Sequence, residues 1–177
     1  MAITIQQAGK EQAALLSTLG AKTFYDAFAA QNKPGDMDQY LRTHFTPEAV
    51  AAEFDQPGAC FYLASMGNEV VGYMKTRTKT PPALADRKCM ELERLYLLET
   101  SHGQGIGRQM LEYCIQQAKN TGCEVLWLGV WEHNPKAINL YRKCGFEKFG
   151  EHIFQLGSDA QTDSLMKLEL HTPLQNS

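Results

Sequence analysis

The chain has 177 residues, of which 44% are hydrophobic and 21% are charged, a balance typical of one globular domain with a single core. Its net charge of −3 argues against nucleic acid as the main partner and is compatible with a cationic substrate. No apolar run approaches the roughly 18–20 residues of a membrane span. The N-terminus lacks a signal-peptide pattern, so we expect a cytoplasmic protein with no membrane partner.

The cysteines favour the same compartment. They number five, an odd count, and no two of them form a C-x-x-C pair, which is unlike a disulfide framework or a zinc site. We interpret all of them as reduced thiols and expect no metal in the protein. The residues are Cys60, Cys89, Cys114, Cys123 and Cys144.

Hydrophobic periodicity and turn residues predict the order of elements along the chain. Strands are predicted over 3–7, 60–64, 69–77, 90–97, 124–131, 146–154 and 164–170. Helices are predicted over 11–30, from 36, over 47–54, from 107 and between 134 and 145, with loops over 78–88 and 156–163. This order indicates a mixed α/β (α+β) sheet with helices on its faces. We predict one domain over 1–172 and a C-terminal tail over 173–177.

The strand over 90–97 leads into a glycine-rich loop. By two-residue alternation, one face carries Leu92, Arg94 and Tyr96, and the other carries Glu91, Glu93, Leu95 and Leu97. The loop is His102-Gly103-Gln104-Gly105-Ile106-Gly107, and the predicted helix follows it directly. Glycines before a helix N-terminus let unpaired backbone N–H groups approach a phosphate, although a tight turn alone is the simpler alternative.

The glycine spacing distinguishes between phosphate-binding loops. It matches neither the dinucleotide pattern G-x-G-x-x-G nor the P-loop. It fits [RQ]-x-x-G-x-[GA] at Gly105 and Gly107, with His102 in the first position. A second segment, residues 134–146, reads N-x-x-A-x-x-x-Y-x-x-x-G-F. Together these motifs resemble those of the GNAT N-acetyltransferases, and the resemblance extends over about residues 1–170.

The resemblance implies a fold, an activity and a set of coenzyme contacts. The fold is a mixed, mostly antiparallel sheet, splayed between its two central strands to hold coenzyme A. The activity is acetyl-CoA-dependent N-acetylation, with acetyl-CoA as co-substrate. The implied coenzyme-binding residues are Leu95, Tyr96, Leu97, His102, Gly103, Gln104, Gly105, Ile106, Gly107, Arg108, Asn134, Ala137, Tyr141 and Lys143.

Three further stretches bear on the substrate. Residues 22–26, 127–132 and 161–163 resemble the bacterial PaiA-type polyamine N-acetyltransferases, which implies spermidine or spermine as acceptor. A polyamine requires carboxylates for ion pairing and aromatic faces for cation–π contacts. Predicted substrate-binding residues are Tyr25, Asp26, Tyr40 and Trp131.

Amine acetylation also requires proton transfer. With a pKa of about 10.4, roughly one alkylamine in 2,500 is the free nucleophile at pH 7, a cost of about 4.6 kcal/mol. A carboxylate can receive the proton directly or through water, and Glu91 and Glu93 are the candidates because they share a predicted face with Leu95 and Leu97. Tyr141 is the candidate acid for the leaving thiolate, with a core aromatic as its simpler role.

Other functions stay open from the sequence alone. One is a GNAT enzyme that acetylates a protein N-terminus, a lysine or another small amine. Another is a non-catalytic acyl-CoA-binding regulatory module on the same fold. In each enzyme reading the partner is an amine substrate and not a nucleic acid, and a homodimer is an option for assembly.

Overall fold

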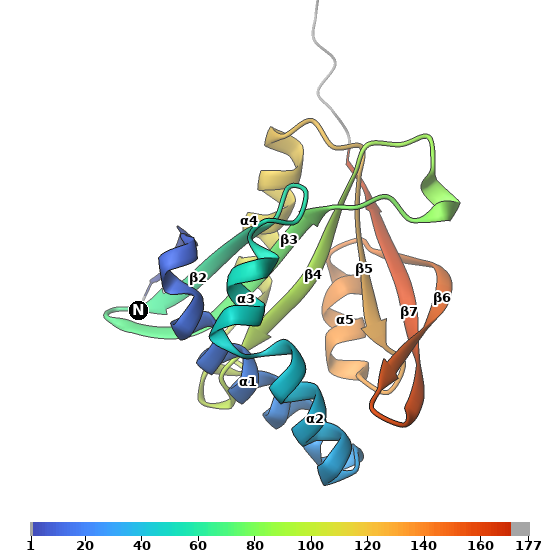
Figure 1. Cartoon of the computed structure of the whole chain (residues 1–177). Coiled ribbons are helices and arrows are strands. Elements are labelled where there is room, and N and C mark those ends of the chain that lie inside the picture. Colours follow the sequence, from blue (N-terminus) through green and yellow to red (C-terminus); the bar gives the residue numbers. More distant parts are fainter. Residues whose placement is uncertain (1, 171–177) are drawn as a thin grey trace, which may run out of the picture.

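A computed structural model describes residues 2–170. Its strands form one seven-stranded sheet in the order β1-β2-β3-β4-β5-β7-β6 (Figure 1). The strands are β1 (Ile3–Ala8), β2 (Cys60–Met66), β3 (Glu69–Thr78), β4 (Cys89–Leu97), β5 (Val125–Trp131), β6 (Glu147–Leu156) and β7 (Asp159–Glu169). The α-helices are α1 (Ala13–Phe28), α2 (Pro34–His44), α3 (Pro47–Glu53), α4 (Ile106–Asn120) and α5 (Pro135–Lys143). The domain end predicted at residue 172 and the tail over 173–177 lie outside the described residues.

The two central strands separate along their length. All neighbouring strands are antiparallel except β4 and β5, which run parallel. Their pairing joins Cys89–Glu91 of β4 only to Val125–Trp127 of β5, and beyond it the strands diverge (Figure 1). The prediction of a mostly antiparallel sheet splayed at its centre is thus confirmed.

A β-bulge in β4 lies where the strands begin to diverge. Lys75 and Thr76 of β3 pair with Arg94 and Leu92, so Glu93 between them is the extra residue. A bulge shifts the side-chain alternation by one position. The strand faces predicted by simple alternation are therefore wrong for β4, because the predicted pattern had no extra residue.

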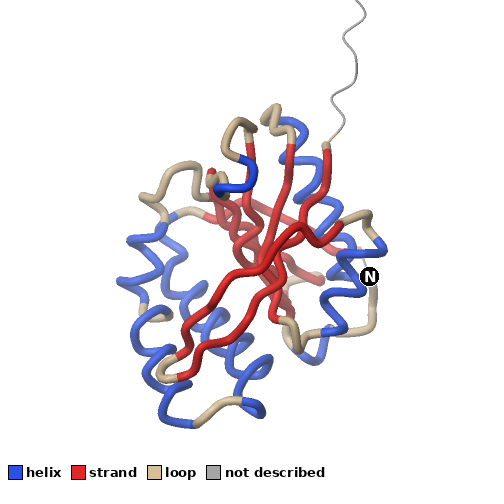
Figure 2. Tube along the Cα trace, turned by 90° about the vertical axis from the view of Figure 1, so that its right-hand side faces the viewer, coloured by secondary structure: helices blue, strands red, loops and turns tan. Residues whose placement is uncertain are grey.

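The helices form two layers, one on each face of the sheet, as the turned view in Figure 2 shows. On one face, α4 and α5 share a buried cluster with Leu92 of β4 and Leu128 of β5. On the other face, α1 and α3 pack Leu16 and Val50 against Phe61 of β2. None of the helices within residues 2–170 is long and apolar enough to cross a membrane.

Local capping fixes the start of two helices, as the sequence indicates. The Thr46 side chain accepts a hydrogen bond from the Ala49 N–H at 3.1 Å and begins α3. The Asn134 side chain does the same for Ala137 at 3.2 Å and begins α5. A proline follows each cap at the first helical position, where its missing N–H has no cost.

The predicted loop over 156–163 is wrong. β6 and β7 pair from Glu147–Lys167 to Leu156–Asp159, with one register shift between Lys148 and Gly150, and residues 157 and 158 form the turn. Gly157 has φ +58, a left-handed conformation that suits tight hairpin turns and that glycine adopts without strain. The polar residues that suggested a loop therefore belong to a β-hairpin, and this hairpin forms part of the wall of the site.

Candidate active site

A cavity of about 460 Å³ opens where β4 and β5 separate. Its walls come from both layers of the protein. On one side lie the loop before α4 and the first two turns of α5, and on the other lie α1, α2 and the β6–β7 hairpin. Since the opening passes between two strands, two reactants can approach each other from opposite faces of the sheet.

The glycine loop forms one end of the cavity. Gly105 has φ +75 and is the N-cap of α4, and the Gln109 N–H donates to its carbonyl at 3.2 Å. The N–H groups of residues 106–108 therefore precede the first intrahelical hydrogen bond and are free to bind an anion. The helix dipole adds partial positive charge at the same point.

Basic residues surround this end of the cavity. His102 lies with Nε2 3.1 Å from the Leu97 carbonyl oxygen and with Nδ1 3.5 Å from Lys136 Nζ. Lys136 also lines the cavity, but the sequence analysis missed it because only the folded α5 brings it to the loop. Arg108 Nε contacts Glu112 Oε1 at 2.9 Å on the exposed surface. A phosphate-bearing ligand would meet both backbone donors and side-chain cations here.

The predicted coenzyme residues divide into two groups. Those that line the cavity are Leu95, Tyr96, Leu97, His102, Gly103, Gly105, Ile106, Gly107, Arg108, Asn134, Ala137 and Tyr141. Gln104 and Lys143 do not line it. The Gln104 amide instead donates to the Thr100 carbonyl at 3.1 Å, and Lys143 lies in the last turn of α5.

Tyr141 projects from α5 into the middle of the cavity wall. It lies two helical turns after Asn134 and therefore on the same side of the helix. Its side chain is 8% exposed, and its ring centroid is 5.7 Å from that of Phe146. Burial raises the pKa of the Tyr141 hydroxyl. The group therefore stays protonated near neutral pH and is a hydrogen-bond donor in an apolar setting.

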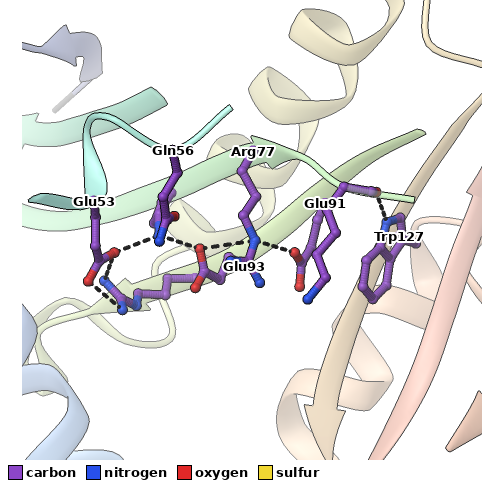
Figure 3. A network of polar contacts seen from close by, with 9 residues as sticks. Glu53, Gln56, Arg77, Glu91, Glu93 and Trp127 are labelled. Atoms are coloured by element: carbon purple, nitrogen blue, oxygen red, sulfur yellow. Dashed lines mark hydrogen bonds and ion pairs between the residues drawn. The ribbon is translucent and has the colours of Figure 1, made fainter. Parts of the chain in front are cut away.

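A buried ionic network runs alongside the cavity and contains both predicted glutamates (Figure 3). Lys75, with no exposed side-chain surface, contacts Glu53 Oε2 at 2.6 Å and Glu93 Oε2 at 2.5 Å. Arg94 contacts the two Glu53 oxygens at 3.0 and 2.9 Å, and Arg77 Nε contacts Glu91 Oε2 at 2.6 Å. Every carboxylate of this network thus has at least one cation in contact.

The network distinguishes the two predicted bases. Burial alone would raise the pKa of Glu93, but Arg94 and Lys75 outweigh it and hold that pKa below its usual value. Glu93 lines the cavity, whereas Glu91 does not. The bulge places Leu95 and Leu97 with the α4 cluster, away from both glutamates. The prediction that Glu91 and Glu93 share a strand face with Leu95 and Leu97 is therefore wrong.

Aromatic side chains line the opposite end of the cavity. Phe24 stacks on Tyr40 with ring centroids 4.6 Å apart, and Phe28 lies 5.7 Å from Trp131. Tyr40 also meets Phe154 of the hairpin edge-on at 5.7 Å. The phenylalanines were missed because their spacing in α1 is also that of an ordinary core-facing stripe.

The remaining predicted substrate residues differ in position. Tyr40, Trp131 and Asp26 line the cavity, and Asp26 accepts from Lys22 at 2.6 Å. Tyr25 is 54% exposed and does not line it. Asp163 of β7 lines the same end, and burial raises its pKa. Within residues 2–170, no three or more His, Cys, Asp or Glu side chains gather as metal ligands would.

Comparison with known proteins agrees with this geometry. Residues 22–146 match the model of the acetyltransferase (GNAT) family. A relative from Lactobacillus delbrueckii subsp. lactis, described as an uncharacterized N-acetyltransferase in the pepI 3′ region, is 34% identical over 169 residues, 95% of this chain and 98% of the relative. The chain belongs to the GNAT acetyltransferase family.

More distant matches extend over nearly the whole chain. An uncharacterized N-acetyltransferase from Mycobacterium tuberculosis is 28% identical over 156 residues, 88% of this chain and 96% of the relative. The crystal structure of PaiA N-acetyltransferase from Thermoplasma acidophilum in complex with coenzyme A has a TM-score of 0.76 at 18% identity, covering 96% of this chain and 99% of that one. The latter likeness shows the fold.

Family, fold and site together define the activity. The chain is an acetyl-CoA-dependent N-acetyltransferase, with acetyl-CoA as its co-substrate.

Proposed function

We propose that the enzyme acetylates a polyamine of the spermidine or spermine class. The observation that carries this proposal is a second pocket that adjoins the aromatic end of the cavity. It has a volume of about 420 Å³, shares Trp131 and Gln161 with the main cavity, and is lined by Glu132 and Asp159. An extended polycation could place one amine inside and keep a distant ammonium near these carboxylates.

The residue shared by the two pockets also suits a cation. Trp131 lines both of them, and an aromatic ring attracts an ammonium group through its quadrupole. Arg94, which lines the cavity, is already paired with Glu53. The PaiA-type likeness of residues 22–26, 127–132 and 161–163 supports the same substrate class.

In the proposed reaction the chain positions both substrates for direct attack in a ternary complex. Acetyl-CoA supplies the activated acetyl thioester. The backbone of Leu95 and Leu97 would hold the pantetheine arm as an added strand, and the N–H groups of residues 106–108 would hold the pyrophosphate. Asn134 would contact the arm, and the Tyr141 hydroxyl would donate to the departing thiolate.

The cellular setting is part of the proposal. All the cysteines are free, and Cys89, Cys114 and Cys123 are buried. Reduced buried thiols support the predicted cytoplasmic location. The homodimer stays a prediction.

A thiol-release assay with acetyl-CoA tests the substrate class. We expect kcat/KM for spermidine to exceed that for propylamine at least tenfold. A factor of this order corresponds to the free energy of one added ion pair or cation–π contact. Asp159→Asn should lower the value for spermidine and leave propylamine unchanged. Asp55→Asn is the matched control because Asp55 pairs with Lys10 far from the cavity.

The other outcomes identify the alternatives. Equal kcat/KM for the two amines would remove the polyamine assignment and leave a monoamine acceptor. A peptide amine that surpasses both would favour the protein N-terminus or lysine reading. Coenzyme binding without thiol release on any amine would indicate a non-catalytic module.

A further inference from the structure

The side chains of Asp163 and His152 both lie over Gly129 of β5. Residue 129 is a glycine, and a Cβ built there would lie 3.5 Å from Asp163 Oδ2 and 3.2 Å from His152 Cε1. The sheet register explains this proximity, because Asp163 of β7 pairs with Trp131 on one side and with His152 on the other. Asp163 lines the cavity, whereas His152 is exposed. The two side chains therefore lie near each other on one face of the sheet, Asp163 in the cavity wall and His152 at the surface.

Asp163 differs in its ion pairing from Glu93 and Asp26, two other carboxylates that line the cavity. Glu93 is held by Lys75 at 2.5 Å and Arg77 at 3.5 Å, and Asp26 is held by Lys22 at 2.6 Å. Within residues 2–170, the Asp163 carboxylate is in no ion pair with a Lys, Arg or His side chain, and burial is the main influence on its pKa. Asp163 can therefore meet an incoming ammonium without first breaking an ion pair.

The pKa directions of the two carboxylates also differ. Burial raises the pKa of Asp163, and His152 opposes the rise only in part. Glu93 is shifted the other way, since Arg94 and Lys75 outweigh its burial. A stronger base takes a proton more readily, so this difference favours Asp163. The titratable groups that face Asp163 are His152 from β6 and Tyr40 from α2, whose pKa is about 12.

We propose that Asp163 is the base that takes the proton of the acceptor ammonium, and that His152 passes this proton to solvent. The inference rests on the proposed acetyl transfer to an amine. In the first step an N–H bond of the ammonium breaks and an O–H bond forms on Asp163, which leaves a neutral amine. The amine lone pair then forms the C–N bond while the C–S bond of the thioester breaks. The second N–H bond of the acylated nitrogen breaks as well, and its proton neutralises the departing thiolate to give the thiol of coenzyme A. The imidazole of His152 receives the proton from Asp163 through an intervening water and releases it to bulk solvent.

Two acceptors test this role in one variant. Asp163→Asn keeps the shape of the side chain but removes the base, so kcat/KM for spermidine at neutral pH should fall about a hundredfold. A fluorinated alkylamine is already uncharged at neutral pH and needs no base. With that acceptor the loss should shrink to a few-fold. A purely structural role would lower the rate with both acceptors alike.

Further variants separate the parts of the pair. His152→Gln should reduce the spermidine rate by a smaller factor, Asp163→Glu should restore part of the activity, and Asp55→Asn should change nothing. Acetyl-CoA affinity and thermal stability, measured in each variant, should stay at the parental values and so show that the fold is intact.

Two results would overturn the inference and still leave the enzyme an acetyltransferase. One is an Asp163→Asn variant with parental activity on spermidine. The other is a Glu93→Gln variant that loses kcat/KM with spermidine but not with the fluorinated amine, while Asp163→Asn loses it equally with both acceptors. If the parental protein releases no thiol with any amine, the proposed function itself fails.

Discussion

Replacing Tyr141 with phenylalanine removes one hydroxyl from the cavity wall and leaves the ring in place. The side chain is 8% exposed and packs against Phe146 with ring centroids 5.7 Å apart. Burial is the main cause of the raised hydroxyl pKa, and no hydrogen bond contributes to it. The phenylalanine variant therefore leaves no hydrogen-bond partner unsatisfied, and we expect the free energy of unfolding to change by less than about 1 kcal/mol.

The expected effect on catalysis is much larger. A preorganised donor to a developing negative charge is commonly worth about 10²–10³ in kcat. The tyrosine is a weaker acid than usual because of its burial, so we take a lower bound of about tenfold, or roughly 1.4 kcal/mol of barrier. Acetyl-CoA affinity should change little, because the hydroxyl acts on charge that appears only as the thiolate leaves.

The assay is single-turnover thiol release, with the coenzyme Kd measured on the same preparation. Single-turnover conditions matter because slow product release would hide a slower chemical step. Tyr113→Phe is the control, since Tyr113 lies on α4 and packs against Tyr62 at 5.4 Å, outside the cavity lining. A Tyr141→Phe enzyme with the parental single-turnover rate would refute the reasoning and leave Tyr141 as a core aromatic.

Other predictions concern the loop and the ionic network. Gly105→Val should weaken acetyl-CoA binding, because φ is +75 at this position and a β-branched residue resists that conformation. The affinity is measured by calorimetry, and an unchanged value would exclude the loop as the coenzyme-binding site. Lys75→Met should lower the free energy of unfolding, measured by urea denaturation, by about 3–5 kcal/mol. The control Lys10→Met, at an exposed ion pair, should lower it by less than about 1 kcal/mol. Because the folded pKa of Glu93 is lowered from 4.5, its stabilisation exists above pH 4.5 and is lost as pH falls through the folded pKa. The stability gap to Glu93→Gln should therefore close in acid, and a constant gap would contradict this sign.

The sequence by itself determined the local structure around the coenzyme loop. Gly105 and the free N–H groups after it depend on a few neighbouring residues, and so do the caps at Thr46 and Asn134. Such features are set by short-range sterics and hydrogen bonds, which a linear pattern records. The same is true of most strands, whose buried residues alternate or run continuously.

Only the tertiary structure decided which residues share the cavity. The bulge at Glu93 arises from the pairing of β3 with β4, and it moves the glutamates off the face of Leu95 and Leu97. The aromatic end of the cavity joins Phe24 of α1 with Asp163 of β7, two elements far apart in the chain. Side-chain periodicity carries no information on which strands become neighbours or where an extra residue enters a ladder. These contacts are therefore fixed by long-range packing, after the local elements have formed.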